Sequence, residues 1–150
     1  MLMRTLLLTH CAATLFMTGV IWYVQVVHYP LMARVNRTEF VAFEAAHRRL
    51  TSFVVVPAML VELAAALALI AVRPATFPPA VAWAGVVLLG LIWFSTFTLQ
   101  VPCHDALLRG FKAEVHARLV RTNWIRTLGW TGRAALALWM IAKAGGRVPA

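Results

Sequence analysis

The stretch SFVVVPAMLVELAAALALIAV, residues 52–72, decides the fold of this chain, and Glu62 is its only charged residue. About 20 consecutive apolar residues form a helix that crosses the ~30 Å hydrocarbon layer of a bilayer. A run this long and this apolar is more than the core of a small water-soluble domain needs. We therefore predict a transmembrane helix here.

Three further stretches of similar character lie at residues 6–27, 79–101 and 124–142. The chain is 62% hydrophobic and 13% charged, whereas about 25% of the residues of a soluble domain are charged. The composition predicts an all-α, integral membrane four-helix bundle that forms a single transmembrane domain over residues 1–150. Arg4 followed by an apolar run also resembles the start of a signal peptide. Because no small-residue cleavage motif follows that run, we expect a retained helix.

The formal net charge is +9, but the basic residues flank the apolar spans and form no stripe on a soluble surface. This placement argues against nucleic-acid binding. The nine basic residues at one end of the four spans are Arg34, Arg37, Arg48, Arg49, Arg109, Lys112, Arg118, Arg121 and Arg126, and the four at the other end are Arg4, Arg73, Lys143 and Arg147. Cytoplasmic connections are enriched in Lys and Arg. We predict a multi-pass protein of the bacterial inner (plasma) membrane with both termini outside the cytoplasm.

The two halves of the chain resemble each other weakly. Residues 25–28 and 100–104 each precede a basic turn, and each turn leads into an amphipathic stretch, 38–51 in the first half and 113–127 in the second. A parallel duplication of one helical hairpin would produce this pattern, with a pseudo-twofold axis along the membrane normal. Chance similarity is the alternative.

Polar residues of the two hairpins are predicted to share one depth. Residues equally far from a hairpin turn lie at equal depth. At a rise of 1.5 Å per residue, the depths of five polar residues agree within about 8 Å. They are His28, Glu44, His47, His104 and Asn123. Polar side chains in apolar helices normally face the bundle interior. We expect these residues to form one layer near the cytoplasmic end of the bundle.

Four residues of this layer are predicted metal ligands. Glu44 and His47 form a Glu-x-x-His pair, which places a carboxylate and an imidazole on adjacent turns of one helix face. With His28 and His104 they supply three imidazoles and one carboxylate, a set that suits iron, copper, zinc or manganese. The alternative is structural, with these side chains satisfying one another's hydrogen bonds.

Asn123 and Arg126 are predicted to face the same layer and to orient a substrate or an anionic oxygen. The alternative places this segment in an interfacial belt, with Trp124 at headgroup depth and Arg126 reaching toward the lipid surface. Deeper in the spans, Glu62 and Arg133 lie at similar heights. An uncompensated charge there would be costly, so we predict a mutual ion pair. It is either purely structural or binds the polar head of a substrate or a proton.

Several short motifs resemble a known group of proteins. They are Trp22-x-x-Gln25-x-x-His28-Tyr29-Pro30-Leu31, Glu44-x-x-His47, Gln100-Val101-Pro102 before His104, and Asn123-Trp124-Ile125-Arg126-Thr127. They resemble small four-helix bacterial membrane proteins similar to the anthrone-oxygenase-like family. The resemblance implies a four-helix membrane fold and oxidation of a small hydrophobic aromatic substrate, without a cofactor.

The residues themselves predict a membrane-embedded, metal-dependent oxidoreductase or oxygenase that acts on a small hydrophobic substrate from the lipid bilayer. One alternative is a haem b-binding electron carrier, with His28 and His104 as axial ligands. Another is a non-catalytic membrane subunit or a small transporter whose polar residues hold the helices together. Assembly into a homo-oligomer stays open.

Overall fold

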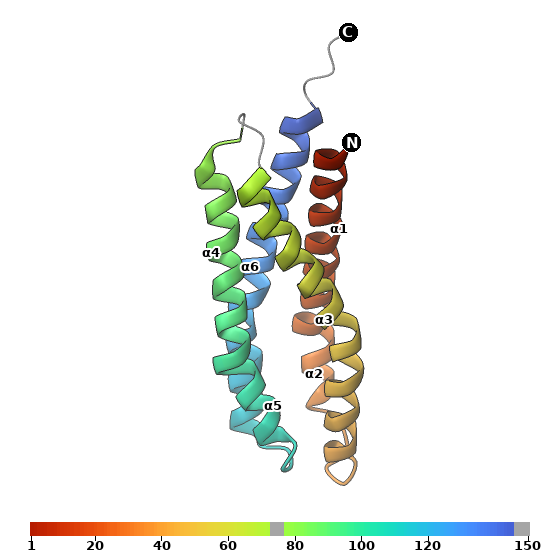
Figure 1. The fold of residues 1–150 in the computed structure, drawn as a ribbon. Helices are drawn as coiled ribbons and strands as arrows, with labels where there is room; N and C mark the ends of the chain where they lie inside the picture. Colours follow the sequence, from red (N-terminus) through yellow and green to blue (C-terminus); the bar gives the residue numbers. More distant parts are fainter. Residues whose placement is uncertain (73–76, 146–150) are drawn as a thin grey trace.

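The computed structural model describes residues 1–72 and 77–145, which form four long helical rods packed side by side (Figure 1). Two of the rods change from α-helix to π-helix and back to α-helix along their length. The elements in chain order are α1 (Leu2–Tyr23), η1 (Val24–His28), α2 (Tyr29–Met32), α3 (Phe40–Val72), α4 (Pro79–Ser95), η2 (Thr96–Gln100), α5 (Val101–Leu107) and α6 (Ala113–Gly145). The predicted all-α four-helix bundle is confirmed.

The rods alternate in direction, so the N-terminus and the end of α6 lie at one end of the bundle (Figure 1). The α2–α3 and α5–α6 turns lie together at the other end. Gly110 in the second turn has φ +122°, a conformation that glycine adopts without the steric penalty of a side chain. Arg73 and Arg147, two of the basic residues assigned to the terminal end, lie outside the described residues.

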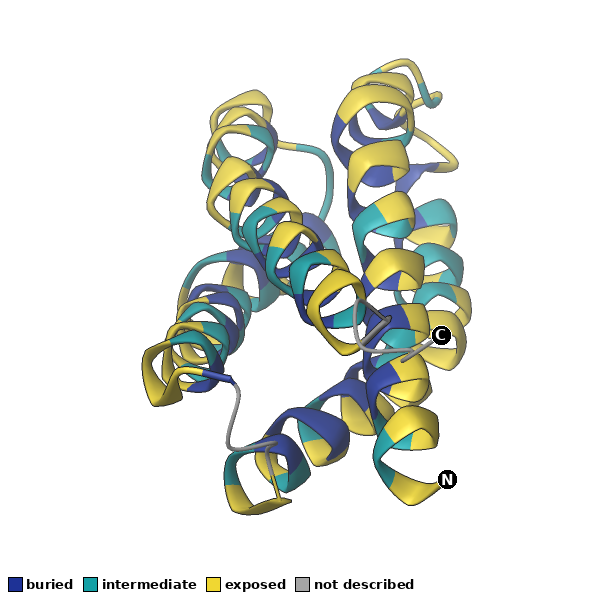
Figure 2. Cartoon of the chain, turned by 90° about the horizontal axis from the view of Figure 1, so that it is seen from above, coloured by how far each residue is buried: buried dark blue, intermediate teal, exposed yellow. Residues whose placement is uncertain are grey.

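Three rods are long and apolar enough to cross a membrane: Leu2–Met32, Phe40–Val72 and Pro79–Leu107. The fourth, α6, is long enough, but Arg126 and Arg133 lower its hydropathy. Helix α6 runs the height of the bundle beside α1 and α4 (Figure 1). Its hydropathy alone does not identify it as a membrane span, so its passage through the membrane stays a prediction. The outward faces of the helices are exposed and the inward faces buried (Figure 2).

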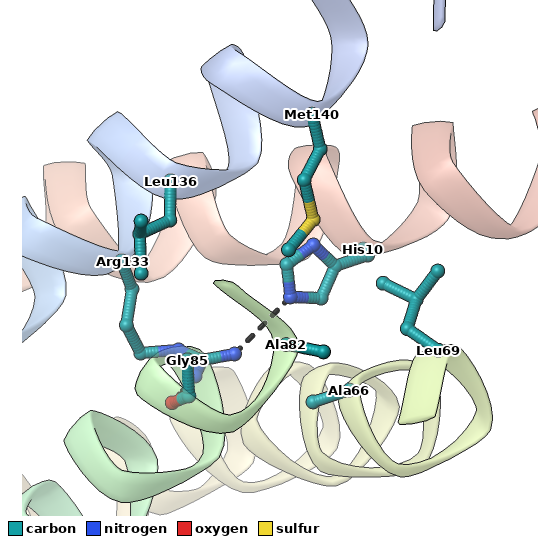
Figure 3. A pocket seen from close by; sticks show the side chains of 8 residues that line it. All are labelled: His10, Ala66, Leu69, Ala82, Gly85, Arg133, Leu136 and Met140. Carbon is teal, nitrogen blue, oxygen red and sulfur yellow. Dashed lines mark hydrogen bonds between the residues drawn. The ribbon is translucent and has the colours of Figure 1, made fainter. Parts of the chain in front are cut away.

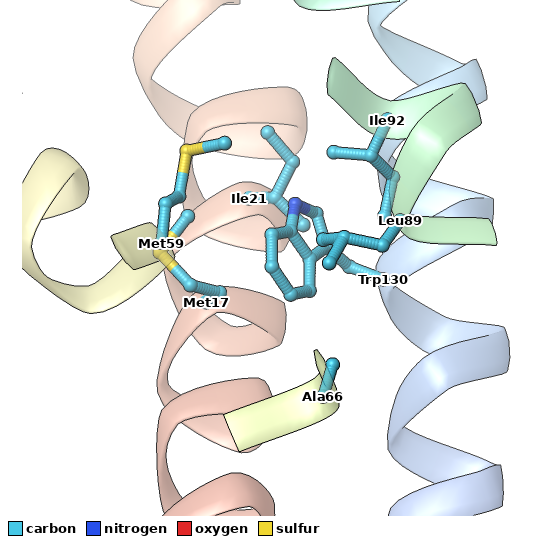
Figure 4. Packing of buried hydrophobic residues seen from close by; sticks show 7 residues of the cluster. All are labelled: Met17, Ile21, Met59, Ala66, Leu89, Ile92 and Trp130. Atoms are coloured by element: carbon cyan, nitrogen blue, oxygen red, sulfur yellow. The ribbon is translucent and has the colours of Figure 1, made fainter. Parts of the chain in front are cut away.

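At mid-height the rods pack around Trp130 (Figure 4). Its indole is fully buried against side chains from the other three rods, namely Met17, Ile21, Met59, Ala66, Leu89 and Ile92. Methionine fills irregular gaps well because its side chain is unbranched and flexible. Along the first rod the layer residues Met17 and Ile21 lie between Thr14 and Gln25, and on α6 Trp130 lies between Thr127 and Arg133. The apolar layer thus separates two polar clusters along the bundle axis.

The two π-helical segments stand at equivalent places in the two hairpins. η1 ends at His28 and η2 at Gln100, and each is followed after one residue by a proline, Pro30 or Pro102. Proline has no N–H to donate to the helical ladder, and single π-turns often occur at functional sites. The two hairpins therefore share one architecture, in which His28 and Gln100 occupy equivalent positions at the ends of the π-helical segments.

Candidate active site

The structure brings together all four predicted metal ligands near the turn end of the bundle. The ring centroids of His28 and His47 are 4.3 Å apart, and those of His47 and His104 are 5.3 Å apart. Nδ1 of His104 lies 2.6 Å from Oε1 of Glu44, whose side chain is fully buried. Three rods thus contribute to one cluster, because these residues lie at equal distances from the two turns.

Hydrogen bonds link Glu44, His104 and Tyr29 into a chain. The Glu44 carboxylate only accepts hydrogen bonds, so Nδ1 of His104 carries the proton of the 2.6 Å contact. The lone pair of the neutral ring is then on Nε2, which accepts from the Tyr29 hydroxyl at 3.1 Å. The guanidinium of Arg126 lies beside the same hydroxyl. A buried carboxylate therefore orients an imidazole whose basic nitrogen faces a phenol and a cation.

His47 packs against His104 of this chain, and His28 packs against His47. His47 Nδ1 is 3.1 Å from the Thr51 hydroxyl, and the His47 ring stacks on His28 at an interplanar angle of 23°. His28 Nε2 and the second carboxylate oxygen of Glu44 are buried without a hydrogen-bond partner among the described residues. Both atoms therefore keep unused hydrogen-bonding capacity beside the cluster.

A cavity of about 160 Å³ opens beside His47 and His104. Its apolar lining comes mainly from α1, η1 and α3, with Met17, Val20, Ile21, Val24 and Val55. Its polar lining includes Tyr29, His47, Gln100, His104 and Arg126. An engineered apolar cavity of ~150 Å³ binds benzene. The space therefore suits one aromatic ring, with a base and a cation at one end.

The atoms of this cluster do not fit a metal ion as they stand. In residues 1–72 and 77–145, no group of three or more His, Cys, Asp or Glu side chains is arranged to hold a metal. Both ring nitrogens of His104 make hydrogen bonds, and Nδ1 of His47 contacts Thr51. The metal site therefore stays a prediction that requires these contacts to rearrange. A haem between His28 and His104 would have to displace His47, whose ring contacts both.

The two residues predicted to orient a substrate have different surroundings. Arg126 lines the cavity and lies beside Tyr29. Asn123 is fully buried and donates from Nδ2 to Oε1 of Gln25 at 2.8 Å, and it is not among the described cavity-lining residues. Gln25 in turn donates to the Val120 carbonyl. Asn123 therefore holds η1 against α6, and the structure gives it no contact with the cavity.

No role was predicted for Tyr29 from the sequence. Its side chain is only 2% exposed, and its carbonyl accepts a hydrogen bond from His116 at 2.8 Å. The available signal was the position of this tyrosine between His28, a predicted metal ligand, and Pro30. Periodicity alone does not separate it from the interfacial aromatic residues that flank most membrane spans.

The second polar cluster lies on the other side of the Trp130 layer. The predicted Glu62–Arg133 ion pair is present, with both side chains buried. Arg133 also donates to the Gly85 carbonyl and to Nε2 of His10, and Thr14 donates to Glu62. His10 and Arg133 border a cavity of about 10 Å³ (Figure 3), which has room for about one water molecule. The contacts of His10 were not predicted.

No family model, curated protein or solved structure matches this chain. The resemblance to the anthrone-oxygenase-like family therefore stays a prediction.

Proposed function

We propose that this protein is a membrane-embedded enzyme that removes a proton from a small hydrophobic substrate, with His104 as the base. One observation supports this function above all. The buried Glu44–His104–Tyr29 hydrogen-bond chain ends at an apolar cavity large enough for one ring. A carboxylate that fixes the tautomer of a histidine and stabilises its protonated form is a recurrent arrangement for general-base catalysis.

Each residue of the chain has a role in the proposed reaction. His104 takes the proton on Nε2, and the adjacent Glu44 carboxylate stabilises the resulting imidazolium. Tyr29 and Arg126 stabilise the negative charge that develops on the substrate oxygen. Donors that are already in place are effective because they need not reorganise during the reaction.

The lining indicates the class of substrate. Apolar walls bind a hydrocarbon ring, and the polar end requires a group whose deprotonated form is an oxyanion. A phenol or a carbonyl compound with an acidic C–H meets both conditions. Such an anion is more easily oxidised than its parent compound, so the oxidoreductase or oxygenase activity predicted from the sequence is compatible with this step.

4-Nitrophenol tests the proton transfer, because its phenolate absorbs at a longer wavelength than the phenol. Detergent-purified wild-type protein is expected to bind it as the phenolate at a pH below its pKa in solution. His104→Gln and Glu44→Gln should abolish this absorbance change. His10→Gln, the same substitution in the other polar cluster, should keep it. An unchanged spectrum with wild type, or an unchanged response in His104→Gln, contradicts the proposal.

The same preparations separate the alternatives that the sequence left open. A stoichiometric transition metal that is lost in both His28→Ala and His47→Ala would favour the metal-dependent enzyme. A Soret band would favour the haem protein. Neither metal nor haem, together with no nitrophenolate signal, would favour a non-catalytic subunit or a transporter.

A further inference from the structure

The cavity beside His104 is more enclosed on the α1 side and reaches the surface on the α3 side. Of its α1 and η1 lining residues, Met17, Ile21 and Val24 are buried and Val20 is half-buried. On α3, Ser52 is exposed and Val55 is half-buried, although both line the same cavity. The opening therefore lies beside α3, away from the tightly packed α1 and α6.

This opening is a slot along the bundle axis. Arg48, Ser52 and Val55 follow one another at helical spacing on α3, which corresponds to a length of about 10 Å at 1.5 Å per residue. The facing wall comes from η2 and α5, with Thr96 and Val101. The slot thus separates the second rod from the third.

The two ends of the slot differ in polarity. At the turn end, Arg48 Nη1 lies 2.7 Å from Asp105 Oδ1, an ion pair that joins α3 to α5. The neighbours of the other end are apolar and exposed: Phe53 is 74% and Phe97 is 59% exposed. Rings of this size on the outer face of a membrane helix contact lipid tails. The slot therefore runs from a charged rim into the hydrocarbon region.

We infer that this slot is a lateral entrance through which an amphipathic substrate dissolved in the bilayer reaches His104. Its apolar part arrives between α3 and η2 from the lipid, while its polar group travels along the Arg48–Asp105 rim. The ion pair joins the two walls at the turn end of the bundle and separates readily, because exposed pairs contribute little to stability. The inference rests on the proposed function for the reaction at His104, but the entrance itself can be tested without that reaction.

The test compares one folded protein with its slot open and blocked. Ser52→Cys is reconstituted in phosphatidylcholine vesicles and divided, and one half is treated with N-phenylmaleimide. The native Cys11 and Cys103 are buried, so the new thiol is the accessible one. A photoreactive alkylphenyl diazirine dissolved in the membrane is then activated, and adducts on Met17 and Val55 are quantified by mass spectrometry. Phe53→Cys, one residue away on the lipid-facing surface, is the matched control.

Blocking Ser52→Cys is expected to lower the adducts inside the cavity several-fold, and blocking Phe53→Cys to leave them unchanged. Equal labelling of the open and blocked Ser52→Cys protein would overturn the entrance. A loss of labelling with both blocked variants would overturn it as well, because the effect would then not belong to the slot. The nitrophenolate signal is measured separately, so its absence beside slot-dependent labelling would reject the base at His104 and keep the entrance.

Discussion

Tyr29 is buried, yet its hydroxyl contacts both His104 and Arg126. In the proposed reaction this hydroxyl rotates from Nε2 of the histidine to the substrate oxygen, which frees the Nε2 lone pair to take the proton. Its backbone carbonyl is held by His116, so the side chain starts from a fixed position. The residue thus combines a rigid attachment with a hydroxyl that can change its partner.

Tyr29→Phe is expected to weaken binding of nitrophenolate by about tenfold to a hundredfold, since a hydrogen bond to a charged group contributes about 1.5–3 kcal/mol. The ring that fills the site remains, so thermal stability should change little. Absorbance titration and a melting curve of the same sample check both points. Unchanged affinity would remove Tyr29 from the oxyanion site.

Glu62 and Arg133 illustrate a different use of buried charge. Removing one partner of a buried pair leaves the other charge uncompensated, which costs about 3–5 kcal/mol. We expect Arg133→Met to destabilise the protein by about that amount, and Glu62→Met with Arg133→Met to recover most of it. Equilibrium unfolding in mixed detergent measures both. If the double variant is folded and still ionises nitrophenol, the pair is structural; if it is folded and does not, the pair serves the site.

At the scale of the elements, the π-turns set the direction of the residues that follow them. η1 and η2 immediately precede Tyr29 and Val101, which open the short α-helices that carry Tyr29 and His104. A π-turn holds more residues than an α-turn, so it rotates the following helix about its axis. This rotation decides which side chains of α2 and α5 reach the cavity.

Helix α6 approaches α4 closely at Gly129. A methyl group at that position would lie 2.8 Å from Cγ1 of Ile92, and the β-branched side chain of Ile92 has little rotamer freedom in a helix. Gly129→Ala is therefore expected to lower the melting temperature, although alanine favours helix formation by about 1 kcal/mol. At Gly19 a methyl group would meet nothing within 4 Å, so Gly19→Ala should not lower it. Equal melting temperatures for the two variants would contradict the close α4–α6 packing.

At the scale of the whole molecule, the bundle places the N-terminus and the end of α6 at one end and both hairpin turns at the other (Figure 1). The positive-inside rule then predicts that the turns are cytoplasmic. Asn36→Cys should react with a membrane-impermeant maleimide only after the inner membrane is opened, and Leu2→Cys should react in intact spheroplasts. The unmodified chain, whose two cysteines are buried, gives the background. The reverse pattern would invert the topology.

The sequence alone was sufficient to predict the bundle and the depth of its polar residues. Each apolar stretch must be long and apolar enough to cross the bilayer by itself. The four spans, including the one that contains Glu62, can therefore be recognised without knowledge of their neighbours. Depth follows from the constant rise of a helix, which is why His28, Glu44, His47 and His104 could be expected to meet. The ion pair of Glu62 and Arg133 followed from the cost of an isolated charge in an apolar span.

Only the tertiary structure decided which atoms bond to one another. A helical wheel assumes one constant rotation per residue, and the π-turns at η1 and η2 break that assumption just before the residues that form the site. Tyr29 consequently reaches His104, while Asn123 binds Gln25 outside the cavity. The slot beside Ser52 also depends on the distance between α3 and α5. That distance results from the packing of all the helices, so it cannot be predicted from any single stretch of sequence.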